Sequence, residues 1–219
     1  DIFINSFPNI LENDNLREPQ INAYVEIYNH FIRDGKRSHA LIVLPTGVGK
    51  TGVMGIAPYY VSKGRVLVIA PRVAIKDNLV KNLDPLNPDN FWIKRKVFPS
   101  PEYLPNVCEY STSLTKDVLD KSNIIILNAQ KLQVRLDSSI LNFLPKDYFD
   151  LIIIDEAHHS TAKTWMDAIN HFSQAKVIKL TGTPFRTDGQ EIEGELVYNY
   201  KLGLAMANNY IKSLENINY

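Results

Sequence analysis

Residues 40–51 read Ala-Leu-Ile-Val-Leu-Pro-Thr-Gly-Val-Gly-Lys-Thr. An apolar run followed by a glycine-containing turn that ends in Lys-Thr is typical of a strand that leads through a phosphate-binding loop into a helix. Gly47 and Gly49 allow the tight turn, so that backbone N–H groups and the positive end of the helix face the phosphates. Lys50 supplies a positive charge for the β- and γ-phosphates, and Thr51 supplies a hydroxyl for Mg²⁺.

The loop departs from the strict pattern at one position. Leu44 stands where the pattern G-x-x-x-x-G-K-S/T begins with glycine. The remainder of the loop still predicts a site for ATP and Mg²⁺. Its predicted contacts are Thr46, Gly47, Val48, Gly49, Lys50 and Thr51.

A second apolar stretch, Leu151–Ile154, ends in two acids. If the stretch is a buried parallel strand, Asp155 and Glu156 lie at its carboxyl end, where ligands bind in open α/β sheets. Asp155 can then hold Mg²⁺ through coordinated water, and Glu156 can orient and deprotonate the water that attacks the terminal phosphate. Either motif alone could be a chance loop or a solvated strand end. The ordered pair predicts ATP hydrolysis, with Glu156, Lys50 and Asp155 as catalytic residues.

Composition excludes several classes of protein. With 219 residues and a charged fraction of 22%, the chain is long enough for one large α/β domain and is not of disordered composition. A formal net charge of zero argues against a strongly basic nucleic-acid surface, so any such contact must be local. Cys108 is the one cysteine in the sequence, which excludes an intrachain disulfide or a cysteine-based zinc site.

The sequence shows no apolar run of membrane-spanning length and no secretion leader. We therefore expect a cytoplasmic protein without membrane contact. The chain begins at Asp1 without a methionine, which indicates an excised fragment or a trimmed terminus.

Helix and strand patterns alternate along the chain. Apolar spacing predicts helices over 16–31, 50–61, 74–83, 131–143 and 161–172. Strands are expected at Ala40–Leu44, Val66–Ala70, Ile124–Asn128, Leu151–Asp155 and Val177–Thr181. Prolines interrupt residues 84–123, where we expect loops and short strands, including one over 93–98. The order predicts an α/β fold with a mostly parallel sheet and helices on both faces.

The ordered motifs resemble those of the first RecA-like domain of a superfamily 2 DEAD/DEAH-box helicase or translocase, which has a P-loop NTPase fold. Residues 45–51 match motif I, and Asp155-Glu156-Ala157-His158 matches motif II in its DEAH spelling. Three further segments, 16–20, 70–72 and 180–184, resemble the glutamine motif, motif Ia and motif III. Residues 127–130 resemble the motif that lies on the nucleic-acid backbone. Gly182, where alanine is usual, is a mild variant.

The resemblance implies roles for further residues. Gln20, with Arg17 as its companion, reads the adenine, and His158, Thr181 and Thr183 couple hydrolysis to movement. Contacts to a nucleic-acid track, made mainly through phosphates, come from Pro71, Arg72, Asn128 and Gln130.

The segment after motif III narrows the resemblance. Residues 183–189, 197–202 and Ala205 are similar to the motor subunits of type I and type III restriction enzymes. This likeness favours DNA over RNA as the track, and restriction-complex subunits as partners. Motors of this family close a second RecA-like lobe around ATP, and that lobe supplies an arginine finger.

The chain ends at Tyr219, shortly after motif III, so we expect that the second lobe is missing and that the isolated fragment is nearly inactive. The expected division is an N-terminal helical segment with the glutamine motif over 1–35, a RecA-like ATP-binding domain over 36–200, and a C-terminal segment over 201–219 that leads toward the second lobe.

The sequence is compatible with two alternative functions. An RNA helicase of similar build fits the motifs, and a nucleotide-binding scaffold without turnover is opposed by the retained lysine and acids. Simpler readings of single residues also exist: a solvated polar position for Gln20 and an ordinary charged helix start for Arg72 and Lys76. Lys94-Arg95-Lys96 is read as a solvated face, His158 as a coupling residue rather than a metal ligand, and His159 as structural.

Overall fold

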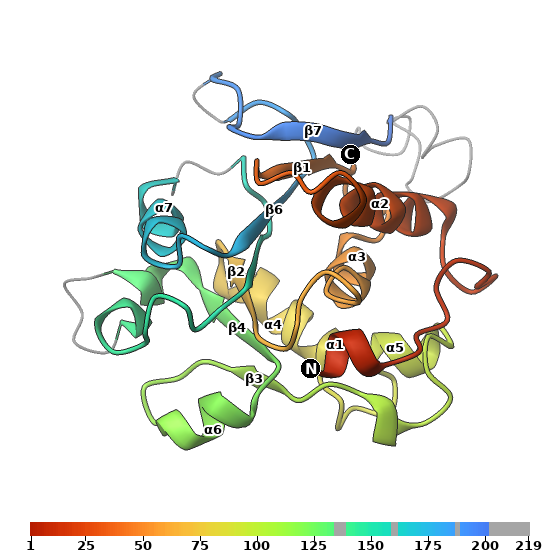
Figure 1. Cartoon of the computed structure of the whole chain (residues 1–219), viewed down its shortest axis with the longest axis horizontal. Coiled ribbons are helices and arrows are strands. Elements are labelled where there is room, and N and C mark those ends of the chain that lie inside the picture. The colour runs from red at the N-terminus through yellow and green to blue at the C-terminus, as the bar shows by residue number, and fades with distance from the viewer. Residues whose placement is uncertain (134–138, 159–161, 187–188, 202–219) are drawn as a thin grey trace, which may run out of the picture.

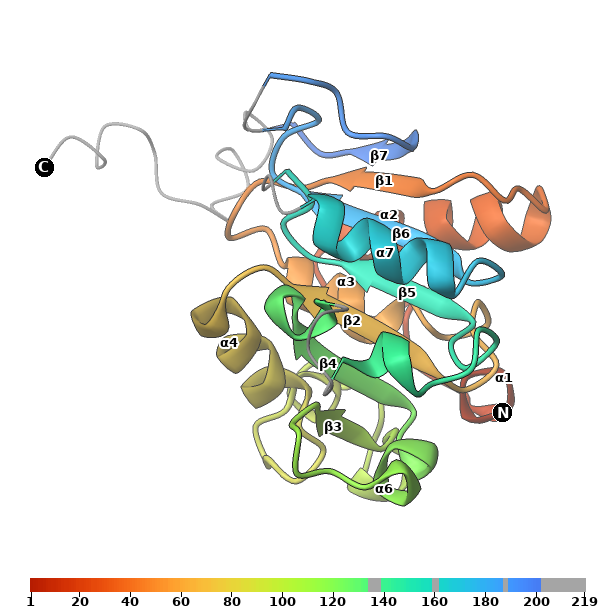
Figure 2. The ribbon, with the colours of Figure 1, turned by 90° about the vertical axis from the view of Figure 1, so that its left-hand side faces the viewer.

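A parallel sheet forms the centre of the computed structural model, which describes residues 1–133, 139–158, 162–186 and 189–201. Within these residues the sheet has seven strands in the order β3-β4-β2-β5-β6-β1-β7, and all neighbouring strands run parallel (Figure 2). The strands are β1 Ala40–Val43, β2 Val66–Ala70, β3 Val107–Glu109, β4 Ile124–Asn128, β5 Leu151–Ile154, β6 Lys176–Thr181 and β7 Glu195–Asn199.

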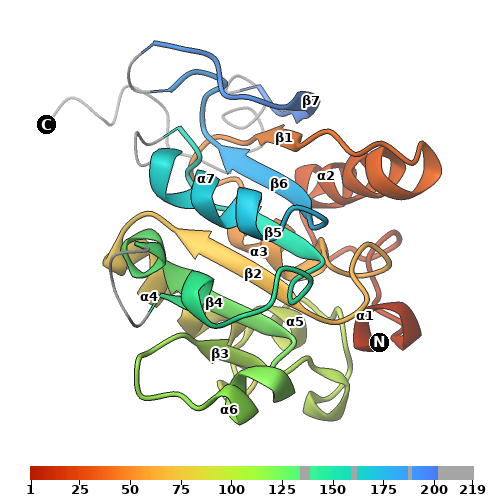
Figure 3. The same ribbon diagram turned by 60° about the vertical axis from the view of Figure 1, so that its left-hand side comes forward.

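Helices cover both faces of this sheet. α2 and α3 lie on the opposite side from α7 (Figures 1 and 3). Because successive strand residues point to opposite faces, Ile42 and Val68 enter one apolar core while Leu41 and Leu67 enter the other. The α-helices are α1 Ile2–Asn5, α2 Glu18–Tyr28, α3 Lys50–Ile56, α4 Val73–Leu83, α5 Phe91–Lys94, α6 Lys116–Lys121 and α7 Ala162–His171.

The predicted α/β class, the mostly parallel sheet and the five long strands are confirmed. Two helices differ in extent from the prediction. The first begins at Glu18 with Arg17 as its N-cap, and its last turn continues as a π-helix, η1 Asn29–Arg33. The helix after the loop ends at Ile56, because Pro58 has no N–H to continue the hydrogen-bond ladder. Residues 1–35 share a core with the sheet, and the proposed division into three segments stays a prediction.

Two expectations were wrong, and one strand was not predicted. Residues 93–98 form no strand, because the Asn90 side chain accepts from Ile93 N at 3.1 Å and starts the short helix α5. In its described parts, the predicted helix over 131–143 is replaced by the 3₁₀ turns η3 Ala129–Leu132 and η4 Ile140–Asn142. Residues 134–138 lie outside the described part. A further 3₁₀ turn, η2, covers Pro101–Tyr103, and β7 was not expected as a strand.

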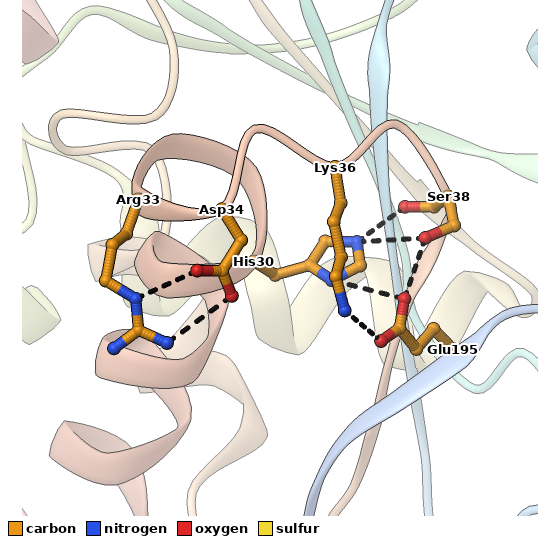
Figure 4. Close-up of polar contacts among 6 residues, drawn as sticks. All are labelled: His30, Arg33, Asp34, Lys36, Ser38 and Glu195. Atoms are coloured by element: carbon orange, nitrogen blue, oxygen red, sulfur yellow. Dashed lines mark hydrogen bonds and ion pairs between the residues drawn. The ribbon is translucent and has the colours of Figure 1, made fainter.

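Polar contacts tie the edge strand β7 to the chain that enters β1 (Figure 4). Glu195, the first residue of β7, accepts from Lys36 Nζ at 2.6 Å and from Ser38 Oγ at 2.9 Å. These two bonds hold the pKa of Glu195 below its usual value. The buried His30 ring contacts the Ser38 carbonyl through Nε2 at 2.7 Å. The cluster therefore sets the register in which Ala40 lies opposite Glu195.

Lys179 is fully buried in the centre of β6. Its Nζ donates to the Glu193 carbonyl at 2.7 Å and lies 4.9 Å from the centroid of the Trp165 ring. Burial lowers the pKa of Lys179 to about 8, against the smaller opposing effect of the Glu193 carboxylate. The neighbouring His39 has its own pKa lowered by burial and by Lys179.

Because of Lys179, the free energy of unfolding of the chain depends on pH in the alkaline range. Between about pH 8 and the unfolded pKa near 10.4 the unfolded chain binds more protons, so the free energy of unfolding rises with pH. From pH 7 to pH 9.5 this residue contributes a rise of about 2 kcal/mol. Urea unfolding at both pH values should show that rise in the wild type and its loss in Lys179→Met. The exposed Lys81→Met is the control, and an equal pH response in all three proteins would contradict the assignment.

Candidate functional site

The loop after β1 has the backbone that a phosphate-binding loop needs. Gly47 has φ 89° and Gly49 has φ 114°, in the left-handed region that glycine occupies without strain. Val48 is fully buried between them and fixes the loop to the core. α3 starts at Lys50, so the loop feeds directly into a helix as predicted.

Lys50 meets both predicted acids. Its Nζ donates to Glu156 Oε1 and lies 3.8 Å from Asp155 Oδ1. The side chains of Lys50 and Asp155 are 11% and 6% exposed, so their charges interact with little screening. With one lysine against two acids, the cluster carries a formal charge of −1 when all three are ionised.

The two acids have different environments. Burial raises the pKa of Asp155 to about 6, although Lys50 opposes this effect. Asp155 Oδ1 is buried without a hydrogen-bond donor in the described part of the chain. Glu156 has φ 53°, a left-handed value that is uncommon outside glycine and turns the chain sharply at the end of β5.

These groups fit Mg²⁺. A buried carboxylate oxygen without a donor and the Thr51 hydroxyl line the same cleft, and oxygen atoms are the ligands that Mg²⁺ takes. The described residues include no group of three or more His, Cys, Asp or Glu that could enclose a metal ion. Mg²⁺ at nucleotide sites is usually held by one or two protein oxygens together with substrate phosphates.

The cleft around this cluster has a volume of about 440 Å³. It is lined by the loop, the two acids and one face of α4: Thr46, Gly47, Gly49, Lys50, Thr51, Ala74, Ile75, Asn78, Leu79, Asp155 and Glu156. The sequence pattern does not predict that the α4 residues line the site, because no motif marks which side of that helix faces the loop. A larger cavity of about 820 Å³ lies between residues 8–12 and α2, but Lys50, Asp155 and Glu156 do not line it.

Gln20 and Arg17 lie against the phosphate loop. Gln20 Nε2 donates to the Gly49 carbonyl at 3.1 Å, and its Oε1 accepts from Arg17 N at 2.9 Å. Arg17 also donates through its guanidinium to the Gly47 carbonyl. The fit is close, because a Cβ on Gly52 would lie 2.3 Å from Gln20 Nε2. Gln20 is buried rather than solvated, and its predicted adenine contact stays a prediction.

The three coupling candidates form a chain of contacts that begins at Glu156. His158 Nδ1 lies 3.3 Å from Glu156 Oε2 and 2.8 Å from Thr181 Oγ1. Thr181 Oγ1 in turn donates to the Thr183 carbonyl at 2.7 Å. This geometry joins the end of β5 to the end of β6. His159 lies outside the described residues, as do Thr187, Asp188, Leu202 and Ala205 of the predicted tail motif.

The predicted nucleic-acid residues gather at the carboxyl ends of β2 and β4. Ala70 lies opposite Asn128, which brings Pro71 and Arg72 beside the start of η3. Arg72 and Gln130 are exposed, whereas Asn128 is buried and accepts from Gln130 N at 2.9 Å. Asn128 therefore holds Gln130 in place, and the nucleic-acid contacts of these residues stay predictions.

No helix in the described ranges is both long and apolar enough to cross a membrane.

Solved structures with the same fold include a helicase and two restriction enzymes. The UvsW helicase of bacteriophage T4 matches with a TM-score of 0.55 and 19% identity, over 83% of this chain and 59% of that one. The type ISP restriction-modification enzyme LlaGI matches with a TM-score of 0.59 and 18% identity, over 91% and 21% of the two chains. A fragment of an HsdR subunit of a type I restriction enzyme from Vibrio vulnificus matches with a TM-score of 0.51 and 19% identity, over 85% and 33%. These matches establish the RecA-like fold.

A curated relative extends the likeness to sequence. The endonuclease subunit of the type I restriction enzyme EcoAI from Escherichia coli is 36% identical over 72 residues, which are 30% of this chain and 9% of that protein. The chain thus spans a small part of this relative and between 21% and 59% of the three solved chains.

A family model described as the res subunit of type III restriction enzymes matches residues 13–186. The matched range runs from the glutamine motif through motif III and includes every described site residue named above. The resemblance to the restriction-enzyme branch of superfamily 2 is confirmed, and the chain belongs to the family of the type III restriction enzyme res subunit.

Proposed function

We propose that this chain is the ATP-binding lobe of a nucleic-acid-dependent ATPase motor that acts on DNA. The observation that carries the proposal is the meeting of Lys50, Asp155 and Glu156 in one cleft beside a loop with two left-handed glycines. A cluster of formal charge −1 repels a polyphosphate unless a divalent cation accompanies it. The site chemistry therefore favours the magnesium complex of the nucleotide.

Each residue has a task in this reaction. Lys50 exchanges its pairing with Glu156 for the phosphates, and the loop backbone holds them in position. Thr51 and Asp155 would hold Mg²⁺, which would supply positive charge beside the phosphate oxygens. Glu156, released from Lys50, accepts the proton of the water that attacks the terminal phosphorus, while the bond from that phosphorus to the bridging oxygen breaks and ADP leaves. His158 and Thr181 link Glu156 to the end of β6 and can transmit the change.

The same proposal includes the partners of the chain. DNA contacts the exposed Arg72 and Gln130 through its phosphates, with little sequence preference. A second RecA-like lobe closes the cleft and supplies an arginine finger, worth about 10³–10⁵ in turnover. We further propose that restriction-complex subunits, as in the relatives, are partners of the chain. We also propose that the protein is cytoplasmic.

Replacing Lys50 by alanine should weaken binding of Mg-ATP at least ~10-fold, because charged hydrogen bonds to phosphate are lost. Calorimetry on the wild type, Lys50→Ala and the exposed control Lys94→Ala measures this effect. The control should bind as the wild type does. Equal affinity in all three proteins would reject the nucleotide site.

Replacing Gln20 by alanine should reduce the preference for ATP over GTP. In the wild type, guanine in place of adenine leaves a polar group of the Gln20 amide unpaired, at a cost of about 1–3 kcal/mol. The alanine variant lacks this amide and therefore loses the discrimination. Competition binding with both nucleotides measures the ratio, with the exposed Glu26→Gln on the same helix as control. An unchanged ratio in Gln20→Ala would show that Gln20 serves only the loop backbone.

Glu156→Gln should separate ATP binding from hydrolysis. Glutamine keeps the size and hydrogen bonding of the side chain but cannot take a proton, so turnover should fall at least ~10²-fold with affinity unchanged. Phosphate release is measured for a two-lobed protein, in which residues 1–219 are joined to a second RecA-like lobe, for its Glu156→Gln variant and for residues 1–219 alone, which should be nearly inert.

Each sample is tested with double-stranded DNA, single-stranded DNA and RNA, and DNA should stimulate most. Stronger stimulation by RNA would favour an RNA helicase. ATP binding without ATP hydrolysis in the two-lobed protein would favour a nucleotide-binding scaffold.

A further inference from the structure

α4 forms one wall of the phosphate cleft. Ala74, Ile75, Asn78 and Leu79 line the cleft together with the loop and the two acids. Their spacing places them on one face of the helix. Gln20, the predicted adenine contact, does not line this cleft, so the cleft corresponds to the phosphate end of the nucleotide.

Asn78 is the one polar member of these four α4 residues. Leu79 is buried in the core, whereas Asn78 is exposed toward the cleft. Its Oδ1 accepts from Asn82 Nδ2 at 3.2 Å, and the same Nδ2 donates to the Asn78 carbonyl at 2.8 Å. These contacts orient the amide and leave Asn78 Nδ2 as a donor for a ligand.

The helix that carries Asn78 is held firmly against the sheet. Lys76 pairs with Glu109 at the end of β3, and the Lys76 side chain is only 14% exposed. Leu79 and Leu83 anchor the opposite end of the helix in the core. A donor on a fixed helix loses little conformational freedom when it binds a ligand.

We propose that Asn78 donates a hydrogen bond to the terminal phosphate of the nucleotide from the α4 wall. This inference rests on the proposed function and adds a specificity residue to it. Lys50 and the two acids mark where the terminal phosphate and its metal lie, and Asn78 borders the same space. A neutral donor suits that position, because a carboxylate there would add to the negative charge of the cluster.

Calorimetry with Mg-ATP and Mg-ADP tests the proposal on residues 1–219. Asn78→Ala should weaken Mg-ATP ~5–10-fold and Mg-ADP less than about twofold, because only ATP presents the terminal phosphate. Asn78→Asp has the same shape with a negative charge and should weaken Mg-ATP further. Lys81→Ala, exposed on the same helix but outside the cleft, should bind both nucleotides as the wild type does.

The outcomes separate this inference from the proposed function. If Lys50→Ala binds Mg-ATP as the wild type does, the nucleotide site itself is rejected. If Lys50→Ala loses affinity while Asn78→Ala and Asn78→Asp bind as the wild type does, only the role of Asn78 is overturned. Equal weakening of Mg-ATP and Mg-ADP also overturns it, because that result excludes a contact specific to the terminal phosphate. Thermal unfolding without nucleotide should give the same midpoint for Asn78→Asp and the wild type.

Discussion

The site depends on one ionic cluster, in which Lys50 lies between Asp155 and Glu156 at the carboxyl edge of the sheet. Burying a charge without a partner is costly, and removing one member of a buried pair typically costs about 3–5 kcal/mol. Lys50 therefore stabilises both acids in the folded chain. It does not compensate both of them, since burial still raises the pKa of Asp155 to about 6. This residual negative charge explains why the site suits a metal-bound polyphosphate.

The surrounding elements fix this cluster in place. β1 and β5 are separated by β6, and parallel pairing brings their carboxyl ends to the same edge. Gln20 on α2 holds the loop at the Gly49 carbonyl, and α4 closes the other side with Asn78. α4 follows Arg72 directly, so one helix borders the phosphate cleft and begins beside the expected DNA surface. Such an element can link the two sites, because a packed helix moves as a unit.

Two of the differences from the predicted elements have an identifiable physical cause. Residues 93–98 have the apolar content of a strand, but Asn90 caps a helical turn there and the Trp92 indole donates to the Gly55 carbonyl at 3.0 Å. The segment is thus shaped by its packing against α3. β7 is an edge strand with mixed burial, so its sequence lacks the apolar run that marked the buried strands. Its position is set instead by Glu195 and the loop before β1.

The sequence by itself determined the elements whose causes are local. The apolar strands, the glycines with positive φ and the helix after the loop follow from side-chain pattern and backbone sterics within a few residues. Only the tertiary structure decided which distant groups meet. Lys50 and Glu156 are 106 positions apart, and Asn78 lines the same cleft as the loop only because α4 packs beside it. Strand order and helix rotation depend on packing across the whole core, and a local pattern does not encode them.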